Sequence, residues 1–442
     1  MMENRNIVKK YSLAEVVLFL IFAVGVVVSM VLVAARGRID LSKPIPLGRS
    51  GVAAPVPVGP GWESGDRWSY EQPNRFELSA VLRTGSRLLA TVQYQYLLAA
   101  EGIDGQEFLK RTADALRVRI VRTGTIRDGL EVEWVQLQAR RTPPDTVVGV
   151  AKLPHGRAIT IHVRTPGDQL LAMKLFKTLV DGVVYAPQEQ LARGAELVGR
   201  MQAAGLTQLV QDMGGFEGEQ TYYVCDSFDQ PRGFVIMQFG RNDTAGEWWK
   251  LKGDRVHYLA ETRGGLSRSH IESGNALERY IWFTQRTRGR RSAGGESDIR
   301  LDADGNLLIS GSVQMGDIRC RPALTVPEML IAQAARVFLD GPTEETVINV
   351  LFDRGSIVPA AVTAPDATRD EENYWRAPHC VRFEYLHAAD NETRLYFDAR
   401  KRLVGRIDGA GRTLIWEPAD RRRLTEAFGD IDRLLGVDGR TR

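Results

Sequence analysis

The N-terminal part of the chain carries a long hydrophobic run, Val16–Ala35, with one Ser, one Gly and no charged residue. A helix rises about 1.5 Å per residue, so about 20 apolar residues span the roughly 30 Å hydrocarbon core of a bilayer. The run therefore predicts a transmembrane helix over residues 16–35, preceded by a cytoplasmic segment of residues 1–15.

Basic residues flank this run on both sides, namely Arg5, Lys9, Lys10, Arg36 and Arg38. Short segments rich in Lys and Arg are preferentially retained in the cytoplasm. The short basic N-terminus therefore favours an orientation with that end inside and the bulk of the chain extracytoplasmic, and the basic residues on the far side narrow the margin. A cleaved signal peptide is the alternative, but signal h-regions have about 7–15 apolar residues and this run is longer. We expect an uncleaved signal anchor that crosses the cell membrane once.

Residues 36–65 are rich in proline and glycine and have almost no hydrophobic period, which predicts an extended linker. Residues 66–199 then show two strand patterns, a helix, four strand patterns and a second helix. Asp104 is placed to cap the first of these helices, over Gly105–Arg117. This order predicts an α+β domain in which helices pack on an antiparallel sheet.

A helical stripe over residues 188–214 predicts a connector packed between two domains, assigned to residues 200–219. Residues 220–417 are almost entirely strand-like. Hairpins are expected across Asp229–Arg232 and across Gly253-Asp254, and one helix over Pro327–Leu339 is expected on the concave face. A C-terminal helix and tail occupy residues 418–442. The predicted fold class is therefore α+β, with a larger, mostly antiparallel β domain second.

The element order of the first domain resembles that of the extrinsic oxygen-evolving subunits of the photosystem, where such a domain is a binding or assembly module. In outline, the second domain resembles the half-barrel sheets of periplasmic lipid or lipoprotein carriers. Both resemblances rest on the order of elements, and both imply binding rather than catalysis.

Charge and cysteine content narrow the function classes. The chain has 442 residues with 58 basic and 55 acidic side chains, well mixed, and a net charge of +3, which gives no electrostatic case for nucleic acid as a partner. Cys225, Cys320 and Cys380 could form one disulfide and leave one buried thiol, or could all be buried thiols. No CxxC or CxxH pair occurs, so no metal site is predicted.

Motifs for chemistry are absent from the sequence, and we predict no catalytic residues and no cofactor. Asp302–Asn306 begins like a calcium loop, but Val313 occupies the twelfth position, so we expect a hairpin turn. His379 and Cys380 are adjacent on a strand pattern and would lie on opposite faces. Four Asp residues precede turn-like stretches and are interpreted as turn residues: Asp229, Asp302, Asp398 and Asp408.

Aromatic residues concentrate in the second domain and are the candidate ligand-binding positions: Trp248, Trp249, Tyr280, Trp282 and Phe283. They would line an apolar groove if they lie on the concave face, and would otherwise be core. The basic run Arg286–Arg291 is expected in a loop, as a solvated hairpin tip or as a contact for anionic lipid, a glycan or an acidic partner.

Together these patterns favour a non-catalytic, membrane-anchored extracytoplasmic protein that binds an envelope protein or an apolar ligand. One alternative is an enzyme whose carboxylates and histidines are dispersed along the sequence. Another is a structural subunit of a membrane complex, in which Gly25 and Ser29 would allow close packing of the anchor helix.

Overall fold

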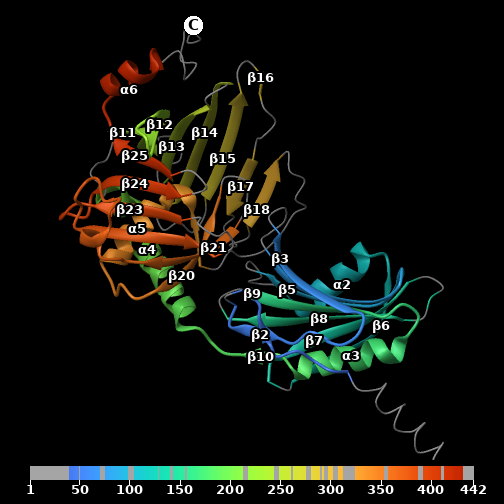
Figure 1. The fold of residues 1–442 in the computed structure, drawn as a ribbon. Helices are drawn as coiled ribbons and strands as arrows, with labels where there is room; N and C mark the ends of the chain where they lie inside the picture. Colours follow the sequence, from blue (N-terminus) through green and yellow to red (C-terminus); the bar gives the residue numbers. More distant parts are fainter. Residues whose placement is uncertain are drawn as a thin grey trace, which may run out of the picture.

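The computed structural model describes residues 39–48, 50–69, 75–97, 104–127, 129–139, 142, 144–154, 157–212, 218–242, 248–259, 262–274, 280–288, 291–292, 297–301, 307–311, 324–352, 357–386, 392–409 and 413–431. The predicted transmembrane segment, residues 16–35, lies outside these ranges. Within them, no helix has the length and apolar character needed to cross a bilayer. The predicted fold class is confirmed at the level of antiparallel sheets with a few helices, mostly β (Figure 1).

The first domain is built on an antiparallel sheet with the strand order β3-β4-β5-β9-β8-β7-β6. Its strands are β3 (Trp62–Ser69), β4 (Arg75–Thr84), β5 (Arg87–Leu97), β6 (Arg119–Ile126), β7 (Val132–Gln138), β8 (Thr146–Leu153) and β9 (Arg157–Arg164). Six of these strands follow the predicted order. β3 adds an edge strand within residues that the sequence divided between the linker and the domain.

Two helices cover opposite faces of this sheet. The N-cap residue of α2 (Gly105–Ala115) is Asp104, whose carboxylate accepts hydrogen bonds from the backbone N–H groups of the first turn, as predicted. α2 buries Leu109 in a cluster with Val148, whereas Phe176 of α3 (Gln169–Asp181) belongs to the cluster of the neighbouring residue Val147. Because successive strand residues alternate between faces, the two helices lie on different sides.

The prediction that residues 36–65 form an extended linker is wrong for the part that the structure describes. β1 (Ile45–Pro46) and β2 (Val52–Ala54) form a small sheet with β10 (Val184–Tyr185). Leu47 is fully buried, and the hydroxyl of Tyr94 donates a hydrogen bond to the carbonyl of Pro55 at 2.8 Å. The segment has no regular period because its apolar residues meet the sheet in irregular backbone, so periodicity could not reveal its burial.

The connector helix is α4 (Glu189–Asp212), with a break at Gly205, where φ is +75°. It packs against β20 and α5 of the second domain. Arg193 extends this contact, because its guanidinium donates to the backbone carbonyl of Glu345 at 2.9 Å. α4 is therefore part of the second domain's packing.

The second domain contains one sheet of fifteen strands. We name two arms. The N-arm contains β11 (Gly218–Asp226), β12 (Pro231–Asn242), β13 (Trp248–Leu259), β14 (Thr262–Gly274), β15 (Tyr280–Arg288), β16 (Arg291–Ser292), β17 (Ser297–Leu301) and β18 (Leu307–Gly311). The C-arm contains β19 (Thr325–Pro327), β20 (Thr346–Leu351), β21 (Ile357–Thr363), β22 (His379–Tyr385), β23 (Glu392–Phe397), β24 (Leu403–Gly409) and β25 (Thr413–Pro418).

The two arms join where β11 pairs with β25, so the first and last strands of the domain are neighbours. The predicted hairpin between β11 and β12 is confirmed. The predicted hairpin across Gly253-Asp254 is wrong, because both residues lie inside β13, where Gly253 pairs with Met237. A Gly-Asp dipeptide favours a turn locally, but pairing with β12 and β14 on both sides keeps the strand continuous.

Helices lie on both faces of the second sheet, and both were predicted, one over Pro327–Leu339 and one in residues 418–442. The 3-10 turn η1 (Glu328–Leu330) leads into α5 (Ile331–Leu339), which shares one buried cluster with Phe383 and Leu395. α6 (Arg421–Phe428) buries Leu424 against Tyr223 and Phe234 on the opposite face. We call the face of the sheet that contacts α5 the inner face and the other the outer face.

Candidate functional site

The inner face can be followed from the C-arm into the N-arm through the strand register. Val235 and Met237 of β12 pack in clusters with Trp416 and with the α5 cluster, respectively, so both belong to the inner face. In an antiparallel sheet, directly paired residues share a face and neighbours along a strand alternate. The residues paired with Val235 and Met237 therefore mark inner-face positions on β13, and the same rule extends across β14–β18.

Two cross-strand rows of the N-arm are apolar on the inner face. One row runs from β12 to β18 through Phe239, Leu251, Ile271, Trp282, Ile299 and Ile309. The next row runs through Arg241, Trp249, Ser273, Tyr280, Leu301 and Leu307. Of these twelve residues, one is charged and one is a serine.

The two outer-face rows beside them contain five charged residues, against one in the inner-face rows. One contains Gly240, Lys250, Glu272, Ile281, Arg300 and Leu308, and the next contains Gln238, Lys252, His270, Phe283, Asp298 and Ser310. An antiparallel sheet with one polar and one apolar face has water on the first and a core or ligand on the second. At this end of the strands, the inner face of the N-arm is therefore the more apolar of the two faces.

This register divides the five predicted ligand-binding residues. Trp249, Tyr280 and Trp282 occupy inner-face rows, whereas Phe283 is in an outer-face row. Trp248 pairs with Asn242 and Gly274, one position from Trp249, and so also has an outer-face position. Three of the five therefore share the inner face, on β13 and β15, with β14 between these two strands. Whether they bind a ligand stays a prediction.

On the C-arm, the inner face holds a buried ion cluster around Arg406 of β24. The guanidinium donates hydrogen bonds to Glu328 Oε1 and to Asp408 Oδ1, both at 2.8 Å. Its Cζ lies 4.2 Å from the centre of the Trp416 ring. Burial disfavours the charged form of Arg406, but the two carboxylates outweigh burial and raise its pKa above the usual value.

Two hydroxyl groups complete this cluster. Thr393 Oγ1 donates to Asp408 Oδ1 at 2.8 Å, and the Tyr385 hydroxyl lies 3.4 Å from Thr393 Oγ1. Burial raises the pKa of Tyr385, which keeps this phenol neutral. With one guanidinium and two carboxylates, the cluster has a net charge of −1, so the charge of Arg406 is already compensated.

Asp408 shows where sequence interpretation failed. The sequence predicts a hairpin-turn role for Asp408 as for Asp398. The carboxylate of Asp398 has that role, because it accepts hydrogen bonds from the backbone N–H groups of Arg400 and Arg402. The side chain of Asp408 bonds Arg406 instead. No pattern of spacing in the sequence could have revealed the ion cluster, because Glu328 and its partner Arg406 are 78 residues apart.

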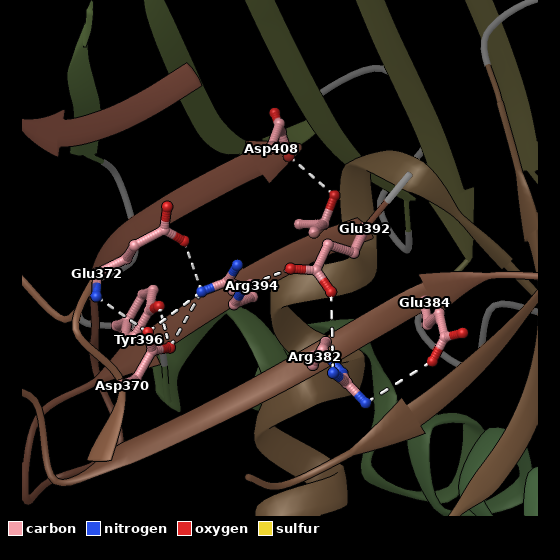
Figure 2. Close-up of polar contacts among 9 residues, drawn as sticks. Asp370, Glu372, Arg382, Glu384, Glu392, Arg394, Tyr396 and Asp408 are labelled. Atoms are coloured by element: carbon pink, nitrogen blue, oxygen red, sulfur yellow. Dashed lines mark hydrogen bonds and ion pairs between the residues drawn. The ribbon is translucent and has the colours of Figure 1, made fainter. Parts of the chain in front are cut away.

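A second ion network lies on the outer face of the C-arm, and in Figure 2 α5 is on the far side of the strands from it. Arg394 lies 2.6 Å from Glu392, 2.7 Å from Glu372 and 3.2 Å from Asp370. The hydroxyl of Tyr396 donates to Asp370 at 2.6 Å. These contacts join the loop before β22 to β23, so we interpret the network as structural.

Asp370 makes the stability of this domain dependent on pH. Burial disfavours its charged form, but the Tyr396 hydroxyl, the Glu372 backbone N–H and Arg394 outweigh burial and lower the pKa of Asp370. A lowered folded-state pKa stabilises the fold above the unfolded value of about 4, and this stabilisation is lost as the pH falls through the folded value. The Tm of Asp370→Asn should therefore be below wild type at pH 7, and the difference should shrink below about pH 4.

The check on Asp370 is a series of thermal unfolding curves from pH 7 to pH 3. Glu426→Gln, which removes an exposed i,i+4 pair on α6, is the control and should change Tm little at any pH. An Asp370→Asn deficit that stayed constant down to pH 3 would contradict the role of the ionised carboxylate.

The remaining sequence predictions concern cysteines and metals. Cys225 and Cys380 are buried free thiols, and burial raises their pKa to about 11 and about 12. Cys320 and the Asp302–Asn306 segment lie outside the described residues. β17 and β18 pair antiparallel on either side of that segment, as a hairpin requires. Among the described residues, no group of three His, Cys, Asp or Glu side chains is placed to hold a metal ion.

Comparisons with known proteins add little to this geometry. No protein-family model matches the sequence, and no curated protein matches it. A β-barrel-like protein of the unknown-function family DUF1849 from Brucella abortus aligns over 46% of this chain and 95% of its own, at 11% identity and a TM-score of 0.30. A protein of unknown function of the DUF3598 family from Nostoc punctiforme aligns over 81% and 96% of the two chains, at 11% identity and a TM-score of 0.11.

Proposed function

We propose that this chain is a membrane-anchored, extracytoplasmic binding protein that holds the acyl chain of a lipid on the inner face of the N-arm. One observation carries the proposal: the strand register collects apolar residues in two adjacent rows on this face and charged residues on the opposite face. Small-molecule sites are lined mostly by apolar and aromatic residues, with a few polar groups that fix the orientation of the ligand.

The arrangement of helices supports this location. α5 belongs to the same buried cluster as inner-face residues of β20–β23, including Ile348, Phe383 and Leu395. It also packs against η1, β19 and α4. The apolar rows of Trp249 and Trp282 lie at the other end of the sheet order, toward β18. A ligand there would cover apolar rows that lie beyond Met237, the residue of β12 that packs against the α5 cluster.

The proposed anchor, residues 16–35, would place the binding face close to a source of lipid. An N-in helix would hold both domains at the outer surface of the membrane, where lipids are at hand. Residues 39–65 pack on the first domain instead of forming a long tether. The distance between the bilayer and the first domain would therefore be short.

The test compares two adjacent positions on one strand. Trp282→Gln changes an inner-face position, and Phe283→Gln changes an outer-face position one residue away. With a pyrene-labelled phosphatidylcholine as the probe, Trp282→Gln should raise the Kd about tenfold or more, because a large aromatic contact is worth about 1.5–3 kcal/mol. Phe283→Gln should leave the Kd within about twofold.

Equal losses in the two variants would contradict an inner-face site, and no saturable binding by the wild type would end the proposal. Far-UV circular dichroism of both variants shows that the comparison is made on folded protein. A protease-protection assay that placed the C-terminus in the cytoplasm would overturn the proposed orientation.

A further inference from the structure

The inner face of the N-arm changes character along its strands. Beyond the two apolar rows comes a row of uncharged, mostly small residues: Met237, Gly253, Ser269, Thr284, Ser297 and Gly311. The next two rows, from β12 to β15, are basic: Val235, Arg255, Ser267 and Arg286, followed by Gly233, His257, Gly265 and Arg288. This face is apolar at one end and basic at the other.

The basic rows contain no Asp or Glu on β12–β15. The outer-face row that lies between them has no charged residue, and consists of Phe234, Val256, Leu266 and Thr287. The outer-face row on the other side of Arg255 has charges of both signs, Asp254 and Arg268. On the C-arm, the row of Gly233 continues through Val224 and Trp416 to Arg406, which Glu328 and Asp408 already neutralise. The excess positive charge of the inner face is therefore concentrated on β13 and β15.

The dimensions of the polarised surface suit one lipid molecule. Trp282 and Arg286 are four residues apart on β15, which is about 14 Å at 3.4 Å per residue. Half the hydrocarbon core of a bilayer, the length of one lipid's chains, is about 15 Å. Arg255 and Arg286 are separated by one strand, so their backbones lie about 10 Å apart, with Ser267 between them.

We propose that the bound lipid is an anionic phospholipid, with its acyl chains over the rows of Trp249 and Trp282 and its phosphate at the row of Arg255 and Arg286. This inference rests on the proposed function and adds a head-group preference to it. Arginine is suited to phosphate because its planar guanidinium can donate two parallel hydrogen bonds. The basic run Arg286–Arg291 supports the assignment, because Arg286 and Arg288 are strand residues of β15 and not loop residues as the sequence predicted.

The experiment uses the full-length chain in a neutral detergent and two pyrene-labelled probes with the same acyl chains, phosphatidylglycerol and phosphatidylcholine. Wild type should bind phosphatidylglycerol at least tenfold more tightly. The double variant Arg255→Gln/Arg286→Gln should lose this preference and keep its affinity for phosphatidylcholine. The matched control Lys252→Gln/Arg268→Gln removes two positive charges from the outer face of β13 and β14 and should keep the preference.

A second measurement needs no variant. Raising the salt concentration from 0.05 M to 0.5 M should weaken the binding of phosphatidylglycerol by wild type and leave that of phosphatidylcholine unchanged, since salt screens charge pairs. Equal affinity for the two probes with no salt effect would overturn the head-group assignment and leave the proposed function intact. Binding of neither probe would instead overturn the proposed function. Loss of preference in the outer-face control as well would contradict the inner-face location.

Discussion

Gly194→Ala should destabilise the protein by about 3 kcal/mol, the upper part of the range for overpacked contacts. A Cβ atom at Gly194 would lie 1.9 Å from the backbone carbonyl oxygen of Val347 on β20 and 3.0 Å from its carbonyl carbon. Backbone atoms of a paired strand cannot rotate away as a side chain can, so α4 would have to lift from the sheet. That movement would weaken the burial of Leu191 and Leu197, which α4 contributes to the core.

The matched control is Gly199→Ala on the same helix, where an added Cβ meets no atom within 4 Å. Alanine there should stabilise the protein by up to about 1 kcal/mol, because glycine is a poor helix former. Urea denaturation followed by circular dichroism measures both variants against wild type. If both substitutions stabilised the protein alike, α4 would not be docked on β20.

Arg406→Met should cost about 3 kcal/mol at pH 7, within the range measured when one partner of a buried ion pair is removed. The Arg406 side chain is 13% exposed, and its loss leaves Glu328 and Asp408 without a counter-charge beside apolar residues. The aliphatic part of Met can still pack on Trp416, so the expected loss is electrostatic and is not caused by a cavity.

Restoring charge balance should rescue this variant. In Arg406→Met/Glu328→Gln/Asp408→Asn no charge remains in the cluster, and most of the lost stability should return, since a neutral replacement of a buried ion cluster is often tolerated. Arg422→Met is the control, because Arg422 is 85% exposed in its pair with Glu426, and it should change stability very little. A triple variant no more stable than Arg406→Met would show that these carboxylates do not cause the loss.

The sequence predicted the first domain well because its signals are local. The alternation in β5, the caps and stripes of α2 and α3, and the turns between β6 and β9 all lie within a few residues of one another. The segment before the domain was misinterpreted for the converse reason. Leu47 and Val52 are buried by contacts with distant residues, and no period in residues 36–65 reports such contacts.

The candidate site shows the same limit at a finer scale. The sequence identified aromatic residues in β13 and β15, but could not tell Trp282 from Phe283, because the inner face is defined by pairing with β12 and by α5. A turn at Gly253-Asp254 would also have given the later residues of β13 other partners than those they have on β12 and β14. A shift of one residue in pairing exchanges the two faces of a strand.

The sequence by itself determined the apolar run of residues 16–35, the α+β class, most strands and helices, and the alternation that makes one face of each strand apolar. Only the tertiary structure decided which rows share a face, that β11 pairs with β25, and that Arg406 meets Glu328 and Asp408. The physical reason is the range of the interactions. Periodicity and capping act within a few residues, whereas pairing and burial join residues that lie tens to hundreds of positions apart.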